Sequence, residues 1–240
     1  MQKFIYNANG IAVAGRITRP IDHPLAPQGV CVLPACGGSV SSRAPAFSLS
    51  DPQSGRLLFS YSSAEMSIDG SESATGVHKT VLLSTVRDIN VANVLKADEV
   101  TIKLTLEYTL STDRVSIGTE ESKFVNLTID GQVFDVTLDH AMAHQAADYE
   151  SFRKNHPEHP EKRGKIHYAL GRHPLLKFDD TGHGYHHHPD FGRVYFGEWH
   201  AAPYTQQLTM LRLELGSPQA GDLWLGGGGG NGMPPPTGGG

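Results

Sequence analysis

Apolar and polar residues alternate along several short stretches of this chain, most regularly over residues 100–110. The stretch VTIKLTLEYTL has an apolar side chain at every second position and Thr, Lys or Glu in between. Successive side chains of a strand point to opposite faces of a sheet. The pattern therefore predicts a strand with one buried face and one face in water.

A β-hairpin is predicted in the next stretch, FVNLTIDGQVFDVTL. Asp130 and Gly131 are the residue types that a two-residue hairpin turn prefers, because both tolerate positive φ. Pairing Ile129 with Gln132 then brings apolar residues of both strands to the same face. The aligned pairs are Leu127 with Phe134 and Val125 with Val136.

Other short strands are predicted between segments rich in Gly and Pro, at residues 11–18, 29–33, 57–62, 77–83, 193–199 and 208–215. Many short strands with turns between them favour an antiparallel β-sandwich or barrel. One stretch, residues 139–155, is rich in Ala and stops before a His-Pro pair, which predicts a single inserted helix. We expect a mainly β domain over residues 1–215 with this helical insertion.

Residues 216–240 differ from the rest, because they form a Gly/Pro-rich C-terminal tail, GSPQAGDLWLGGGGGNGMPPPTGGG. Such a composition buries too little apolar surface to offset the entropy lost on ordering. The tail is therefore predicted to become ordered only against a neighbouring subunit. The residues expected to make that contact are the apolar anchor and the proline run: Leu223, Trp224, Leu225, Pro234, Pro235 and Pro236.

Net charge and the distribution of apolar residues limit the classes of partner and the cellular locations that we expect. The net charge of -5 disfavours nucleic acid as a partner. No run of 18 apolar residues occurs, and the N-terminal stretch lacks the basic and apolar regions of a signal peptide. We expect no membrane partner, and either a cytoplasmic location or export by a route without an N-terminal signal peptide.

Four histidines lie close together in TGHGYHHHPDFGRVYFGE, residues 181–198. In an extended segment His186 and His188 point to one side, and His183 or His200 is needed to complete a metal site. Imidazole ligands favour a divalent transition metal such as zinc, nickel or copper. The competing interpretation is an exposed, His-rich polar loop that gains charge between roughly pH 7 and pH 5.

Other candidate chemistry has less support. His140, His144 and Asp148 recur every four residues along the predicted helix, but position 141 is Ala and lacks the Glu of an HExxH motif. Ser39 does not lie in a GxSxG motif. No catalytic residue is therefore assigned, and no cofactor beyond a possible transition metal is expected.

Two stretches, FVNLTIDGQVFDV and FGRVYFGE, resemble parts of uncharacterised bacterial β-rich proteins, a resemblance that implies no activity. By elimination, the sequence favours a structural protein without enzymatic activity. It would self-assemble as a homo-oligomer, in a filament, shell or ring, with the tail touching neighbouring subunits. The alternative is a histidine-dependent metal-binding enzyme or a small-ligand-binding β-barrel.

Overall fold

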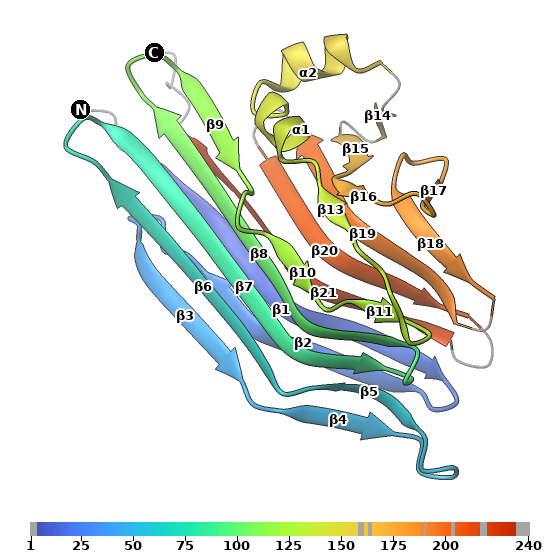
Figure 1. Cartoon of the computed structure of the whole chain (residues 1–240). Coiled ribbons are helices and arrows are strands. Elements are labelled where there is room, and N and C mark those ends of the chain that lie inside the picture. Colours follow the sequence, from blue (N-terminus) through green and yellow to red (C-terminus); the bar gives the residue numbers. More distant parts are fainter. Residues whose placement is uncertain are drawn as a thin grey trace.

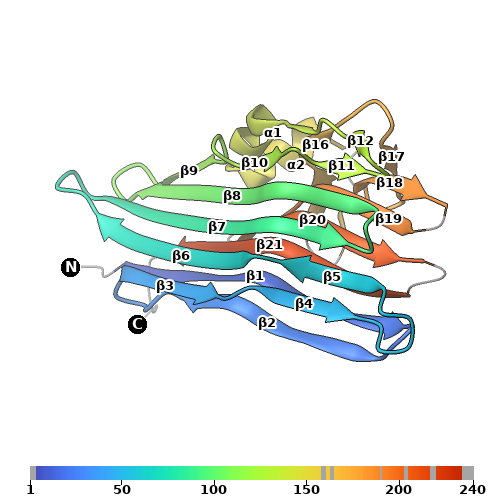
Figure 2. The ribbon, with the colours of Figure 1, turned by 60° about the horizontal axis from the view of Figure 1, so that its bottom comes forward.

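The strands of the protein form two long layers, which Figures 1 and 2 show from two directions in a computed structural model. The structure describes residues 4–157, 161–162, 165–189, 191–202, 205–216 and 220–233. Every pairing between its described strands is antiparallel. The prediction of a mainly β, antiparallel sandwich is therefore confirmed.

The first sheet joins the beginning of the chain to its end. Its strands are β1 (Ile5–Arg19), β2 (His23–Val32), β14 (Glu161–Lys162), β15 (Lys165–Ala169), β17 (Lys177–Phe178), β18 (Gly184–His188), β19 (Gly192–Ala202), β20 (Thr205–Leu215) and β21 (Ala220–Met233). The main path runs in the order β14-β15-β19-β20-β21-β1-β2. β18 and β15 pair with the same edge of β19, β18 near the beginning of the strand and β15 near its end.

The second sheet is built from the middle of the chain. Its strands are β3 (Gly38–Ala44), β4 (Phe47–Ser50), β5 (Leu57–Tyr61), β6 (Ser63–Glu72), β7 (Val77–Val91), β8 (Leu95–Thr109), β9 (Arg114–Gly118), β10 (Lys123–Val125), β11 (Thr128–Ile129) and β12 (Gln132–Val133). β13 (Thr137–Leu138) and β16 (Gly171–Arg172) form a separate short pair.

The core lies between β1, β20 and β21 on one side and β6, β7 and β8 on the other. Small residues let the layers approach closely. A Cβ atom on Gly228 would come within 2.4 Å of Leu82, and one on Gly10 within 2.6 Å of Met66. Glycine at these inward positions therefore makes room for the large side chains of the opposite sheet.

The alternating stretch at residues 100–110 is confirmed as a strand, because it forms most of β8. Its residues Val100, Ile102 and Leu104 are fully buried between the sheets. The other predicted strands lie in β1, β2, β5, β7, β19 and β20. The alternation of apolar and polar residues predicted these strands correctly, because it shows directly which face of a strand is buried.

The predicted hairpin is present, with Ile129 opposite Gln132. Asp130 and Gly131 have φ of +53° and +75°, as the two-residue turn requires. The ladder is short, and Val125 pairs with Glu99 of β8 instead of Val136. The first strand of the hairpin therefore pairs with β8 of the second sheet a few residues before the turn.

The helical insertion consists of two short helices in the described residues, α1 (His140–Gln145) and α2 (Tyr149–Asn155), where one continuous helix was expected. They lie near β15 and β20 (Figure 1). The break occurs because the carboxylate of Asp148 accepts a hydrogen bond from the backbone N–H of Ser151 and so begins a new helix. Neither helix in the described residues has the length and apolar character needed to cross a membrane.

The prediction that the Gly-rich tail is separate from the β domain is wrong for residues 220–233, whereas its contact with a neighbouring subunit stays a prediction. These residues form β21, which pairs with β1 on one side and β20 on the other. Leu223 and Leu225 are fully buried in the core of their own chain, whereas Trp224 is exposed on the opposite face. Pro234, Pro235 and Pro236 lie outside the described residues.

The tail was expected to be separate because its composition cannot support folding in isolation. Glycine cannot contribute side-chain burial, but its backbone N–H and C=O groups can pair with two existing strands. Neighbouring strands supply both the hydrogen bonds and the apolar surface that the tail lacks.

Replacing Gly131 with Val is predicted to destabilise the fold by about 1–3 kcal/mol, because a β-branched residue is strained at positive φ. No other atom lies near the position of the added Cβ, so the cost comes from the backbone alone. Urea unfolding followed by circular dichroism measures it. Gln132→Val, at the exposed neighbouring position, is the control and should change stability little; equal losses in both variants would contradict the turn assignment.

Ending the chain after Gly221 is predicted to abolish cooperative folding, because β1 and β20 would lose the strand between them. Burial of Leu223 and Leu225 contributes about 3–6 kcal/mol together, which is comparable with a typical total stability of about 5–15 kcal/mol. Thermal melting by circular dichroism tests this. A chain ended after Met233 keeps all of β21 and is the matched control; a truncated chain that melts like this control would refute the prediction.

Candidate metal centre

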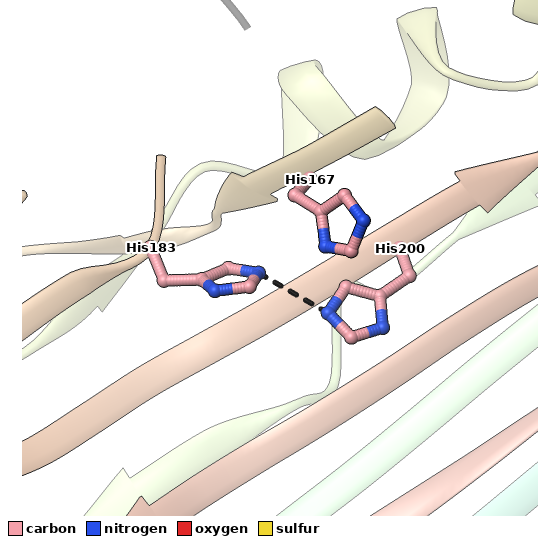
Figure 3. A group of neighbouring side chains, drawn as sticks. All are labelled: His167, His183 and His200. Carbon is pink, nitrogen blue, oxygen red and sulfur yellow. Dashed lines mark hydrogen bonds between the residues drawn. The ribbon is translucent and has the colours of Figure 1, made fainter. Parts of the chain in front are cut away.

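Three histidines from separate segments meet on the outer face of the first sheet. His167 lies on β15, directly opposite His200 of β19, and His183 lies just before β18. Each ring offers one nitrogen, and these nitrogens lie within 4.8 Å of one another. Figure 3 shows the rings facing a common space, with the dashed line joining His183 and His200.

Gly197 explains why β19 presents this face. Its φ is +62°, and its carbonyl accepts a hydrogen bond of 2.7 Å from the backbone N–H of Leu170. Before Gly197 the side chains of the strand that pack in the hydrophobic core are Val194 and Phe196, and after it they are Trp199 and Ala201. The alternation is thus shifted by one residue at Gly197. The shift brings Glu198 and His200 to the outer face, where Arg212 contacts both Glu198 and Tyr195.

Two oxygen atoms lie against the Nδ1 side of the His183 ring. Its Nδ1 atom lies 2.8 Å from the hydroxyl oxygen of Thr181 and 3.3 Å from Oε1 of Glu198. A proton on Nδ1 can donate to these oxygens, which leaves Nε2 with its lone pair directed at His200. The two Nε2 atoms are 3.1 Å apart.

Arg212 holds the side chain of Glu198 in place. It is only 4% exposed, and both of its oxygens accept hydrogen bonds of 2.7 Å from the guanidinium of Arg212. The guanidinium in turn lies over the ring of Tyr195, with its carbon 3.6 Å from the ring centre. This chain of contacts orients Glu198, and through it the ring of His183.

The environment keeps the rings uncharged. Burial lowers the pKa of His183, although Glu198 and Asp179 oppose the shift. Burial and then the neighbouring rings of His167 and His183 lower the pKa of His200 to about 3. Neutral imidazole is the form that binds a metal ion, so these two ligands are available at neutral pH without losing a proton first.

Two of the three histidine nitrogens have the spacing that a tetrahedral metal ion requires. Zinc–nitrogen bonds of about 2.0–2.1 Å place two ligand atoms about 3.3 Å apart, close to the 3.1 Å between His183 and His200. The wider spacing within the group, up to 4.8 Å, means that a ring must rotate to complete the site. The arrangement can therefore hold a metal ion through three nitrogen ligands.

The structure brings together only part of the predicted ligand set. His183 and His200 are adjacent, but His186 and His188 face the hairpin of β11 and β12 instead. The ring of His186 lies 4.9 Å from that of Phe134, and Nε2 of His188 lies 3.9 Å from the carboxylate of Asp130. The run is also not an exposed loop, because residues 184–188 form β18 and only His187 among them is exposed.

Sequence reasoning missed His167 and Glu198. His167 lies more than ten residues before the histidine run, and only the pairing of β15 with β19 brings it to His200. The alternation of KIHYA, residues 165–169, was a usable signal for a strand but not for its partner. The second candidate set is separated as well: Asp148 caps α2, and His144 pairs with Glu120.

Comparison with known families places part of this site in context. The family described as a domain of unknown function (DUF8256) matches residues 4–168, which is more than half of the chain. The chain belongs to this family. The match includes His167 but ends before His183 and His200. No curated protein and no solved structure matches the chain.

The lowered pKa of His200 predicts a loss of stability in acid. Its folded pKa, about 3, lies below the value of an unfolded histidine, about 6.5. The unfolded chain therefore binds the proton first, so the stabilisation is complete above about pH 6.5 and is lost progressively as the pH falls toward about 3. His200→Gln removes this titration.

Thermal midpoints measured in EDTA between about pH 7 and pH 4 should therefore fall less steeply for His200→Gln than for the parent chain. His187→Gln, on an exposed side chain of the same sheet, should follow the parent. Parallel curves for the parent and His200→Gln would show that His200 does not titrate in this way.

Proposed function

We propose that the chain binds a divalent transition metal through His167, His183 and His200. The observation that carries the proposal is the pair of Nε2 atoms 3.1 Å apart, one of them on a ring whose Nδ1 faces a buried carboxylate. A carboxylate behind a ligating histidine orients the ring and makes the other nitrogen a better donor. A proton between the two Nε2 atoms would be replaced by the metal ion.

Charge also supports a cation at this position. Carboxylate oxygens of Glu198 and Asp179 lie within 4.0 Å of Nδ1 of His183, and both side chains are largely buried. Three nitrogen ligands favour zinc, nickel or copper over magnesium or calcium, which prefer oxygen. Three protein ligands would leave one position of a tetrahedral ion for water or an external ligand.

Self-association, which the sequence favoured, stays a prediction. Its argument rested on a tail that needs a neighbouring subunit, and residues 220–233 find their partners within their own chain. The metal site therefore has the better support, because it rests on named contacts.

Metal binding is tested by titrating the full chain with zinc in a calorimeter and with cobalt by visible absorption. We expect one ion per chain, and a loss of affinity of at least about tenfold for His167→Ala, His183→Ala and His200→Ala. Glu198→Gln should weaken binding by about 10–100-fold while leaving all three ligands in place.

The matched control replaces His186, His187 and His188 together with Gln, and it should bind as tightly as the parent. Circular dichroism checks that each variant is folded. Binding that survives in the triad variants but disappears in this control would assign the metal to the histidine run. No saturable binding by the parent chain would overturn the proposal.

A further inference from the structure

A hollow of about 390 Å³ lies on the outer face of the first sheet beside the histidines, and the side chain of Gln207 in its lining forms a hydrogen bond with His200. It crosses β1, β21 and β20, and the polar residues that line it are Asn7, Asn9, Thr205, Gln206, Gln207 and Thr209. Gln207 pairs with His200 in the register of β20 and β19, so the hollow begins one strand away from the histidines.

The floor and one end of the hollow are set by β21. Gly226 has φ of +58° and shifts the alternation of the strand, as Gly197 does in β19. Trp224 before it and Gly227 after it therefore both lie on the outer face, whereas Gly228 faces the core at Leu82. The result is a floor without side chains next to an aromatic ring that is 40% exposed.

The fold does not itself require glycine at position 227. A Cβ atom there would meet only ordinary contacts, at 3.7 Å from the carbonyl of Ile11 and 3.9 Å from the hydroxyl of Thr209. Gly227 thus keeps the floor open without serving the packing of the core. Its position also shows that the hydroxyl of Thr209 faces the hollow.

Thr209 adds a hydroxyl to the lining of the hollow. Its side chain makes no hydrogen bond within the described part of the chain, and its hydroxyl lies 3.9 Å from the position of a Cβ atom on Gly227. The hydroxyl is therefore open to a hydrogen-bonding partner in the hollow. A polar ligand in the hollow would supply that partner.

We propose that the hollow binds a neutral sugar ring of an oligosaccharide, stacked on Trp224. The lining residues carry no charge, which removes the cations that a phosphate or carboxylate ligand would need. Amides and hydroxyls both donate and accept hydrogen bonds, as sugar hydroxyls do. The negative face of an indole attracts the C–H groups of a sugar ring.

Two other ligand classes fit less well. A wholly apolar ligand would leave the amides and the Thr209 hydroxyl unpaired. A peptide strand would need free backbone groups, but β21 pairs with strands on both sides and β20 pairs with β19 and β21. The inference does not require the metal, because no triad histidine lines the hollow and only Gln207 of its lining contacts one of them, His200.

The test uses the full chain in EDTA and calorimetric titration with neutral hexasaccharides of glucose in α and β linkage, of mannose, and of N-acetylglucosamine. At least one of them should bind saturably and shift the fluorescence of Trp224, since Trp199 is fully buried. A hexamer of galacturonic acid, which is charged, should bind at least about tenfold more weakly.

Three variants locate the site. Trp224→Ala and Gly227→Val should each weaken binding by about tenfold, the first by removing the stacking surface and the second by filling the floor. Thr209→Val, nearly equal in shape, should weaken it by about fivefold. Gly227→Ala and Trp224→Phe are the controls for folding, and their thermal midpoints should match that of the parent.

Three results would overturn the proposal. One is that none of the hexasaccharides binds the parent chain. Another is binding that is unchanged in both Trp224→Ala and Gly227→Val. A dimer of the parent chain that dissociates in Trp224→Ala, seen by light scattering, would assign this face to a second copy instead and would equally overturn it.

Discussion

Strand β21 is the element on which both layers of the molecule depend, and the run of glycines in its second half is the constraint that shapes them. Toward the core, Gly228 leaves space for Leu82 of the opposite sheet. Toward solvent, Gly227 leaves a hollow. Its backbone joins β1 to β20, and therefore the first residues of the chain to the last strands. A segment that cannot fold alone is thus central once two neighbours pair with it.

Shifts of alternation at glycine decide what the outer face of the first sheet displays. Gly197 and Gly226 both have positive φ, which β-branched and bulky residues adopt only at a cost. The shift at Gly197 brings Glu198 and His200 to the face that carries His167. The shift at Gly226 brings Gly227 to the side of Trp224. The metal centre and the hollow therefore each depend on a glycine at positive φ that shifts the alternation of side chains, one in β19 and the other in β21.

The electrostatics of the histidine group favour ligation over charge. Burial lowers the pKa of His183 and of His200, and the neighbouring imidazoles add to that effect. The carboxylate of Glu198 is held by Arg212, so it can orient His183 without moving. A surface histidine cluster that responds to pH would need the opposite arrangement, with exposed rings free to gain a proton.

The sequence by itself determined the local elements, because their signals lie in neighbouring residues. The alternation at residues 100–110 and the turn at Asp130 and Gly131 are local in this sense. Tertiary structure decided the rest, since glycine has no side chain to indicate where β21 belongs. It also decided which histidines meet: His167 reaches His200 only through pairing between distant strands, whose register depends on the packing of the whole sheet.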